Sequence, residues 1–144
     1  MNGVYFDSAY LVKCYVSDLD SARVRKLFID SQMVSSSSLC LAEVACAIHR
    51  LVREKVITAP QAADIRRVFG SHIKSGIVVL IPLSDTILQA VQFVLATLPQ
   101  SIFLRSGDAV HIASAQQHGF AEIWTNDRHM LKAAHHFGIA GRSV

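Results

Sequence analysis

Short apolar runs alternate along the chain with longer segments in which apolar residues recur every three or four positions. The short runs predict strands, and the longer segments predict amphipathic helices. The expected strands are residues 4–6, 32–34, 77–81, 122–125 and 138–140. The expected helices are one directly after residue 7 and those at 21–29, 41–52, 60–74, 84–95, 106–119 and 127–134. This alternation predicts a single α/β domain over residues 1–144, in which helices cover both faces of a mostly parallel central sheet to give three layers.

Three features of the pattern carry more specific expectations. The four serines at 35–38 predict a loop that supplies the N-cap of the following helix. The continuous β-branched run at 77–81 is typical of a strand buried on both faces. Three cysteines, Cys14, Cys40 and Cys46, stand in apolar segments without close spacing. We expect them to be small buried residues rather than a disulfide framework or a zinc site.

Composition narrows the class of protein. Apolar residues make up 51% of the chain and charged residues 17%, and the mean hydropathy is +0.35, which excludes disorder. The apolar run at 77–83 is too short to span a bilayer, and the N-terminus lacks the basic start and apolar stretch of a signal peptide. We therefore expect a soluble, cytoplasmic protein. So apolar a composition in a small chain also suggests that part of the surface lies under another subunit or protein.

Four of the eleven acidic residues stand in markedly apolar surroundings: Asp7, Glu43, Asp108 and Asp127. Asp7 and Asp127 each follow a predicted strand, which places them at the carboxyl edge of the sheet, where ligands bind in such folds. Carboxylates are rarely buried unless they are paired or bind a metal. Two carboxylates about 4 Å apart repel by roughly 4 kcal/mol at an effective dielectric of 20. If the four converge, they need protonation or a bridging cation, and oxygen ligands favour Mg²⁺ or Mn²⁺.

A simpler explanation covers several of these acids one at a time. An aspartate at a strand-to-helix junction is a preferred N-cap, worth roughly 0.5–2 kcal/mol. This role accounts for Asp7, Asp108 or Asp127 individually. It is weaker for Glu43, whose neighbours one turn away, Cys40 and Ala47, are not polar.

The four acids stand in short motifs: Asp7-Ser8 after the first strand, Glu43 in L-A-E-V, Asp108 in G-D-A-x-x-x-A-S-A, and Thr125-x-Asp127 after a late strand. The order of these motifs resembles that of the PIN-domain family, and most closely that of its VapC-type toxin ribonucleases of type II toxin–antitoxin pairs. The resemblance covers nearly the whole chain, and the segment after Gly138 matches it least well.

The resemblance implies a Mg²⁺- or Mn²⁺-dependent endoribonuclease that hydrolyses RNA phosphodiesters with metal-activated water and leaves 5′-phosphate and 3′-hydroxyl ends. It implies that Asp7, Glu43, Asp108 and Asp127 form the catalytic, metal-holding quartet, with Asp7 and Asp108 as the direct ligands. Ser8 and Thr125 match supporting polar positions of the same site. The resemblance also implies a cognate antitoxin, for which helices 21–29 and 41–52 are the expected groove, and a homodimer.

Other polar residues near the predicted site receive smaller roles. The cations closest to it in sequence are Lys13, Arg105 and Arg128, which are candidates for RNA phosphate contacts. We interpret His111 and His129 as solvent-facing helix residues that the chemistry does not need. The formal net charge of +3 permits a polyanionic partner without requiring one.

Two alternative functions stay open at this point. A PIN-like module could bind RNA or a protein without cutting, although it would then keep four mutually repelling acids without a use for them. A housekeeping RNA-processing nuclease would use the same chemistry as a toxin. The small size, with no added RNA-binding domain, favours the toxin.

Overall fold

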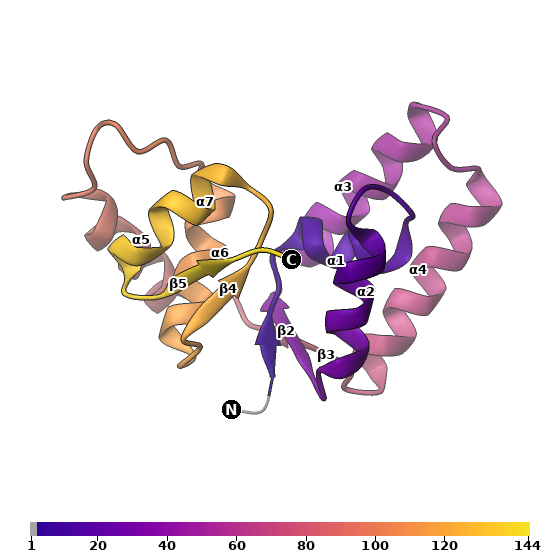
Figure 1. Cartoon of the computed structure of the whole chain (residues 1–144), viewed down its shortest axis with the longest axis horizontal. Helices are drawn as coiled ribbons and strands as arrows, with labels where there is room; N and C mark the ends of the chain where they lie inside the picture. Colours follow the sequence, from indigo (N-terminus) through magenta and orange to yellow (C-terminus); the bar gives the residue numbers. More distant parts are fainter. Residues whose placement is uncertain (1–2) are drawn as a thin grey trace.

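The computed structural model describes residues 3–144, and Figure 1 shows helices on both sides of a short-stranded sheet. The strands are β1 (Val4–Tyr5), β2 (Val34–Ser37), β3 (Val78–Ile81), β4 (Glu122–Trp124) and β5 (Ala140–Arg142). β2 pairs in parallel with both β1 and β3, and β4 pairs in parallel with β5. A single parallel bridge between Phe6 and Trp124 joins the two groups. The strand order is therefore β3-β2-β1-β4-β5, which confirms the predicted α/β fold with a parallel sheet.

The helices begin and end close to the positions that the sequence predicts. They are α1 (Ser8–Tyr15), α2 (Ser21–Asp30), α3 (Cys40–Arg53), α4 (Ala59–Lys74), α5 (Asp85–Leu95), α6 (Ser106–Gln117), α7 (Arg128–Ala133) and the 3₁₀ turn η1 (Ala134–Phe137). Thr58 and Gln61 form a reciprocal capping box at the start of α4. Ser84 caps α5 by accepting a hydrogen bond from the Ile87 N–H. No helix within residues 3–144 has the length and apolar character of a membrane span.

Two apolar clusters lie on opposite faces of the sheet. Successive strand residues point to opposite faces, and accordingly Tyr5 belongs to the cluster with α5, α6 and α7, whereas Phe6 belongs to the cluster with α1, α3 and α4. Figure 1 shows these two groups of helices on either side of the strands. The sheet is thus the middle layer of three.

The serine run does not form the predicted loop. Ser35, Ser36 and Ser37 are buried in β2, between β1 and β3. Neighbours on both sides satisfy the strand's backbone: the Phe6 N–H donates to the Ser35 carbonyl, and the Ser38 N–H donates to the Ile81 carbonyl. Short side chains also let α6 pack close to β2. The expected serine N-cap is wrong as well, because Leu39 occupies that position in α3 without a side-chain cap.

The apolar run at 77–81 is at the edge of the sheet and not at its centre. Among residues 3–144, β3 has β2 as its one neighbouring strand, and its middle residues Val79 and Leu80 are only partly buried. The expectation that residues 77–81 form a strand buried on both faces is therefore wrong for its middle residues. The last strand forms at Ala140–Arg142, two residues later than expected. Of the cysteines, Cys40 is buried, Cys14 is partly buried and Cys46 is exposed, so the expectation is wrong for Cys46.

Candidate active site

The strand order creates a crevice at the carboxyl ends of β1 and β4. The chain proceeds from β1 outward through β2 and β3, and then returns to the other side of β1 with β4 and β5. Such a reversal is where parallel α/β sheets bind ligands, because the loops on either side diverge there. Asp7 follows β1 at this point, and Thr125 and Asp127 follow β4.

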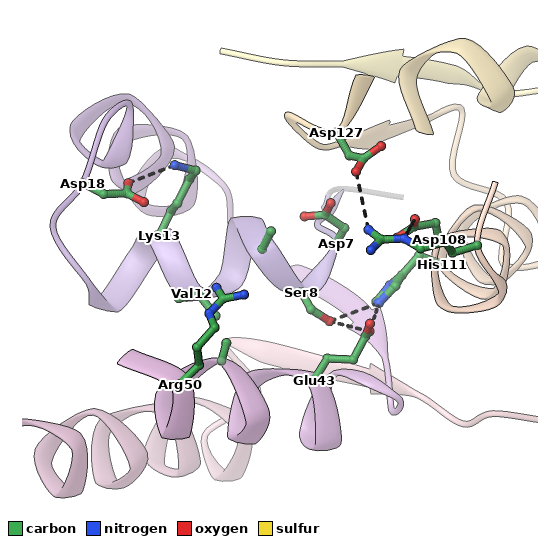
Figure 2. A pocket seen from close by; sticks show the side chains of 13 residues that line it. Asp7, Ser8, Val12, Lys13, Asp18, Glu43, Arg50, Asp108, His111 and Asp127 are labelled. Atoms are coloured by element: carbon green, nitrogen blue, oxygen red, sulfur yellow. Dashed lines mark hydrogen bonds and ion pairs between the residues drawn. The ribbon is translucent and has the colours of Figure 1, made fainter. Parts of the chain in front are cut away.

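A pocket of about 350 Å³ opens at this crevice. All four acids singled out from the sequence line it, and they come from the junction of β1 and α1, from α3, from α6 and from the loop after β4 (Figure 2). The remaining lining residues are Ser8, Ala9, Val12, Lys13, Asp18, Ala47, Arg50, Arg105 and His111. The structure therefore brings together residues that are far apart in sequence.

Asp7 is the most deeply buried of the four acids, with 4% of its surface exposed. It caps α1, because its Oδ1 accepts a hydrogen bond from the Tyr10 N–H at 2.8 Å. Its Oδ2 accepts one from the Thr125 hydroxyl at 2.5 Å. Burial raises the pKa of Asp7, and these two hydrogen bonds only partly offset the effect. A nearby cation would stabilise the charged form of a carboxylate that is buried in this way.

Asp127 is also a helix cap. Its Oδ1 accepts hydrogen bonds from the His129 and Met130 N–H groups at the start of α7, at 2.8 and 3.0 Å. Its own N–H donates to the Thr125 Oγ1 at 3.0 Å, so one hydroxyl connects Asp7 with Asp127. The capping explanation thus holds for Asp7 and Asp127. The Oδ2 of Asp7 is bonded to Thr125, whereas the Oδ2 of Asp127 lies 3.9 Å from the Arg105 Nη2 in the pocket.

Asp108 does not cap its helix, because Arg105 occupies the N-cap position of α6. The Arg105 Nε lies 3.3 Å from the Asp108 Oδ2, and its Nη2 lies 3.9 Å from the Asp127 Oδ2. Burial raises the pKa of Asp108, the Arg105 guanidinium opposes this, and the charges of Asp127 and Glu43 add to it. A cation of the chain thus lies between two carboxylates of the pocket.

Glu43 projects from the first turn of α3 toward α1 and α6. Its Oε1 accepts hydrogen bonds from the Ser8 hydroxyl at 2.9 Å and from the His111 Nε2 at 2.6 Å (Figure 2). Burial alone would raise the pKa of Glu43, but the His111 and Ser8 interactions outweigh it, and the pKa is lowered. These two hydrogen bonds therefore favour the charged form of Glu43.

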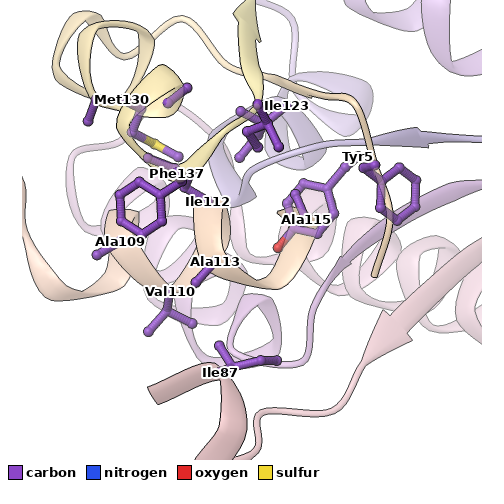
Figure 3. Packing of buried hydrophobic residues seen from close by; sticks show 14 of the residues in the cluster. Tyr5, Ile87, Ala109, Val110, Ile112, Ala113, Ala115, Ile123, Met130 and Phe137 are labelled. Carbon is purple, nitrogen blue, oxygen red and sulfur yellow. The ribbon is translucent and has the colours of Figure 1, made fainter. Parts of the chain in front are cut away.

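His111 does not face solvent as predicted. Only 1% of its surface is exposed, and both ring nitrogens have partners. The α6 residues from Ala109 to Ala115 are all buried, and apart from His111 and Ser114 they are apolar. Figure 3 shows apolar side chains of this helix among Tyr5, Ile87, Ile123 and Phe137. Apolar residues on all sides of a helix indicate that it is buried, and this signal could have shown that His111 is buried. His129 is half-buried, and its ring contacts that of Phe103 at a tilted angle.

The three cations predicted to contact RNA lie in different positions relative to the pocket. Lys13 lines the pocket but is paired with Asp18 at 2.9 Å, and Arg105 is paired with Asp108. Arg128 is exposed and is not among the residues that line this pocket. Sequence reasoning missed Arg50, which lines the pocket two turns of α3 after Glu43. The seven-residue spacing, which returns to the same helix face, was the available signal.

The donor chemistry of the pocket fits a hard divalent cation, because four carboxylates line it. Within residues 3–144, no three acidic, histidine or cysteine side chains already converge closely enough to hold an ion. Arg105 forms ion pairs with Asp108 and Asp127 in this pocket, and its side chain is 68% exposed.

Comparison with known proteins identifies the family. The PIN-domain profile matches residues 4–136, so the chain belongs to the PIN-domain family. The resemblance drawn from the sequence motifs is thereby confirmed. The search of curated proteins found no match.

Solved structures share this fold at low sequence identity. VapC20 of Mycobacterium tuberculosis, described as a sarcin-ricin loop cleaving toxin, superposes with a TM-score of 0.68 at 15% identity, over 90% of this chain and 94% of that one. VapBC2 of Rickettsia felis, solved with a promoter DNA fragment, has a TM-score of 0.65 at 15% identity, over 98% of both chains. FitAcB of Neisseria gonorrhoeae has a TM-score of 0.64 at 13% identity, over 96% and 95%.

Proposed function

We propose that this protein is a Mg²⁺- or Mn²⁺-dependent endoribonuclease and the toxin of a toxin–antitoxin pair. The observation that carries the proposal is the convergence of Asp7, Glu43, Asp108 and Asp127 on one pocket at the switch point of a PIN-domain sheet. The similar structures include a toxin described as cleaving RNA of the sarcin-ricin loop, which supports RNA as the substrate class.

The four acids would hold the metal, with Asp7 and Asp108 as direct ligands and Glu43 and Asp127 completing the set. A bound divalent ion lowers the pKa of its water and neutralises the phosphoryl oxygens. The chain's own residues orient the ligands. Thr125 fixes the direction of the Asp7 carboxylate, and Ser8 fixes that of Glu43.

Cations at the pocket would bind the phosphates of the RNA. Arg50 is the strongest candidate, because no ion pair within residues 3–144 involves it, whereas Lys13 and Arg105 already have acidic partners. Glu43 and Arg50 are seven residues apart on α3, a rise of about 10 Å along the helix axis. An RNA strand that is cut beside the four acids would therefore place a neighbouring phosphate near Arg50. Arg128 would act only outside the pocket.

The partner proposals rest on the family and on exposed apolar surface. α1 packs against both α2 and α3. The pocket described above lies along α1 and α3, and no residue of α2 lines it. It is therefore not the groove between α2 and α3 that the sequence led us to expect for the antitoxin. Apolar side chains nevertheless protrude from both helices of the expected antitoxin groove, at Ile29 of α2 and Leu41 of α3. We propose that an antitoxin segment covers this side. A homodimer and a single functional domain over residues 1–144 are further parts of the proposal.

Cleavage of total cellular RNA by the purified protein tests the function. We expect cutting in Mn²⁺ or Mg²⁺, none in EDTA, and none with Asp7→Asn, whose side chain can still cap α1 and leave the fold intact by circular dichroism. The Arg105 ion pairs would also suit a non-catalytic module, in which they would permanently neutralise Asp108 and Asp127. A folded protein, free of antitoxin, that cuts nothing in any metal would favour that module.

A further inference from the structure

We propose that His111 is a positioning residue that holds Glu43 for metal binding, and that Tyr5 sets which ring nitrogen of His111 does so. This proposal rests on the proposed metal site. It concerns His111, a buried side chain of the pocket wall, and Tyr5, which is buried next to it, rather than residues that would touch RNA or metal.

A continuous chain of hydrogen bonds leads from the central sheet to the pocket. The Ser37 N–H of β2 donates to the Tyr5 hydroxyl at 2.9 Å. The Tyr5 oxygen lies 3.0 Å from the His111 Nδ1. On the other side of the ring, Nε2 lies 2.6 Å from the Glu43 Oε1 and 3.1 Å from the Ser8 Oγ. The chain thus joins β1, β2, α6 and α3 at one carboxylate.

One assignment of protons satisfies every group in this chain with the hydrogen bonds that the structure shows. The Glu43 carboxylate only accepts, so Nε2 donates to it across 2.6 Å. The Tyr5 oxygen accepts the Ser37 N–H, and the Tyr5 proton can be donated to Nδ1 across 3.0 Å. On this assignment His111 carries a proton on Nε2 and accepts at Nδ1.

The arrangement decides which oxygen of Glu43 can meet a metal. Ser8 and His111 both bond to Oε1. Oε2 lies on the side of Gly107, at the start of α6, beside Asp108. Fixing Oε1 with two bonds therefore leaves Oε2 as the ligating atom. Partners that orient metal ligands typically change metal affinity 10–100-fold when they are removed.

Mn²⁺ titration of the metal-free protein tests this role without any RNA. We expect His111→Leu to weaken Mn²⁺ binding about 10–100-fold, and His111→Gln to recover part of the loss because its amide can donate one hydrogen bond. Tyr5→Phe should weaken binding less, because Nε2 stays in place while its tautomer is no longer imposed.

Two matched controls separate positioning from general packing. Tyr15→Phe removes the hydroxyl of another tyrosine–histidine pair, in which Tyr15 lies 2.8 Å from the His72 Nδ1 outside the pocket. His129→Leu removes the half-buried ring that contacts Phe103. Both should bind Mn²⁺ as the wild type does. Equal affinity of wild type and His111→Leu would overturn the proposal.

Ring ¹⁵N NMR of His111 in metal-free protein gives a second readout, which also covers a His111 variant that fails to fold. We expect a protonated Nε2 and an unprotonated Nδ1, with this preference reduced in Tyr5→Phe. A neutral ring protonated at Nδ1 would overturn the proposal. If wild type shows the expected tautomer but binds no Mn²⁺, the proposed metal-dependent function fails, and the positioning role fails with it. Mn²⁺ binding in wild type that is unchanged in His111→Leu leaves that function standing and overturns only the positioning role.

Discussion

The Thr125 hydroxyl donates a hydrogen bond to the Asp7 Oδ2 at 2.5 Å, although the two residues are 118 positions apart in sequence. The bond joins the carboxyl ends of β1 and β4, where a single bridge between Phe6 and Trp124 also connects the two halves of the sheet. The same hydroxyl accepts the Asp127 N–H. One small side chain therefore sets the relative positions of two of the four pocket acids.

Thr125→Val should move metal binding to higher pH. The Thr125 hydrogen bond lowers the pKa of Asp7 against the larger effect of burial, so its removal raises that pKa further. Protons then compete with the metal up to a higher pH. Mn²⁺ affinity measured from pH 5 to 9 would show the shift, and identical profiles for Thr125→Val and wild type would contradict it.

The stability of metal-free protein should depend on pH through Asp7. Burial raises its folded pKa above the unfolded value of about 3.9. The stability contributed by the protonated group is fully present below the unfolded value and is lost as the pH rises through the folded pKa. Asp7→Asn should therefore gain stability relative to wild type as the pH rises from about 4. Urea unfolding in EDTA across this range measures the free energy of unfolding of both proteins. If the value for Asp7→Asn minus that for wild type falls with rising pH, the account is refuted.

Millimolar Mg²⁺ or Mn²⁺ should raise the melting temperature, because the ion binds only the folded pocket. At 100 times the Kd the gain is about 2.7 kcal/mol. Asp108→Asn should lose much of this gain. The variant should still fold, because Asp108 does not cap α6 and its negative charge is repelled by those of Asp127 and Glu43. Thermal unfolding with and without metal gives both values. An equal response of mutant and wild type would mean that Asp108 is not a ligand.

Arg50→Gln should weaken RNA binding and reduce its salt dependence. One fewer phosphate contact lowers the slope of log affinity against log salt by about 0.7 for a single strand. Arg53→Gln is the matched control, since Arg53 lies one turn further along α3 and does not line the pocket. Binding of a non-cleavable RNA at several salt concentrations separates the two variants. A larger loss with Arg53→Gln would move the RNA path away from Arg50.

Gly107→Ala should keep the fold and lower the activity. The new Cβ would lie 3.2 Å from the Glu43 Oε2, so the carboxylate has to shift by a few tenths of an ångström. Alanine is also the better helix former by about 1 kcal/mol. We expect unchanged or higher thermal stability together with kcat/KM reduced about tenfold, because displacements of 1 Å at a reacting site cost about 100-fold. Full activity would show that Glu43 tolerates displacement.

Local pattern was sufficient for the elements and for the four acids. The caps at Thr58 and Ser84 and the acids after β1 and β4 depend on residues a few positions apart, and such interactions are visible in a single sequence. The PIN-domain resemblance then followed from their order along the chain.

What the sequence by itself determined is therefore the α/β alternation, the family and the set of acidic residues at strand ends. Only the tertiary structure decided that the serines of β2 form a central strand while the apolar β3 lies at the edge, because strand order is set by pairing between distant segments. Long-range packing also buried His111 against Tyr5 and Glu43 and placed Asp127 beside Arg105. Side chains that are 68 or 106 positions apart cannot be paired from the sequence alone, since each contact is specified by the surface of another element.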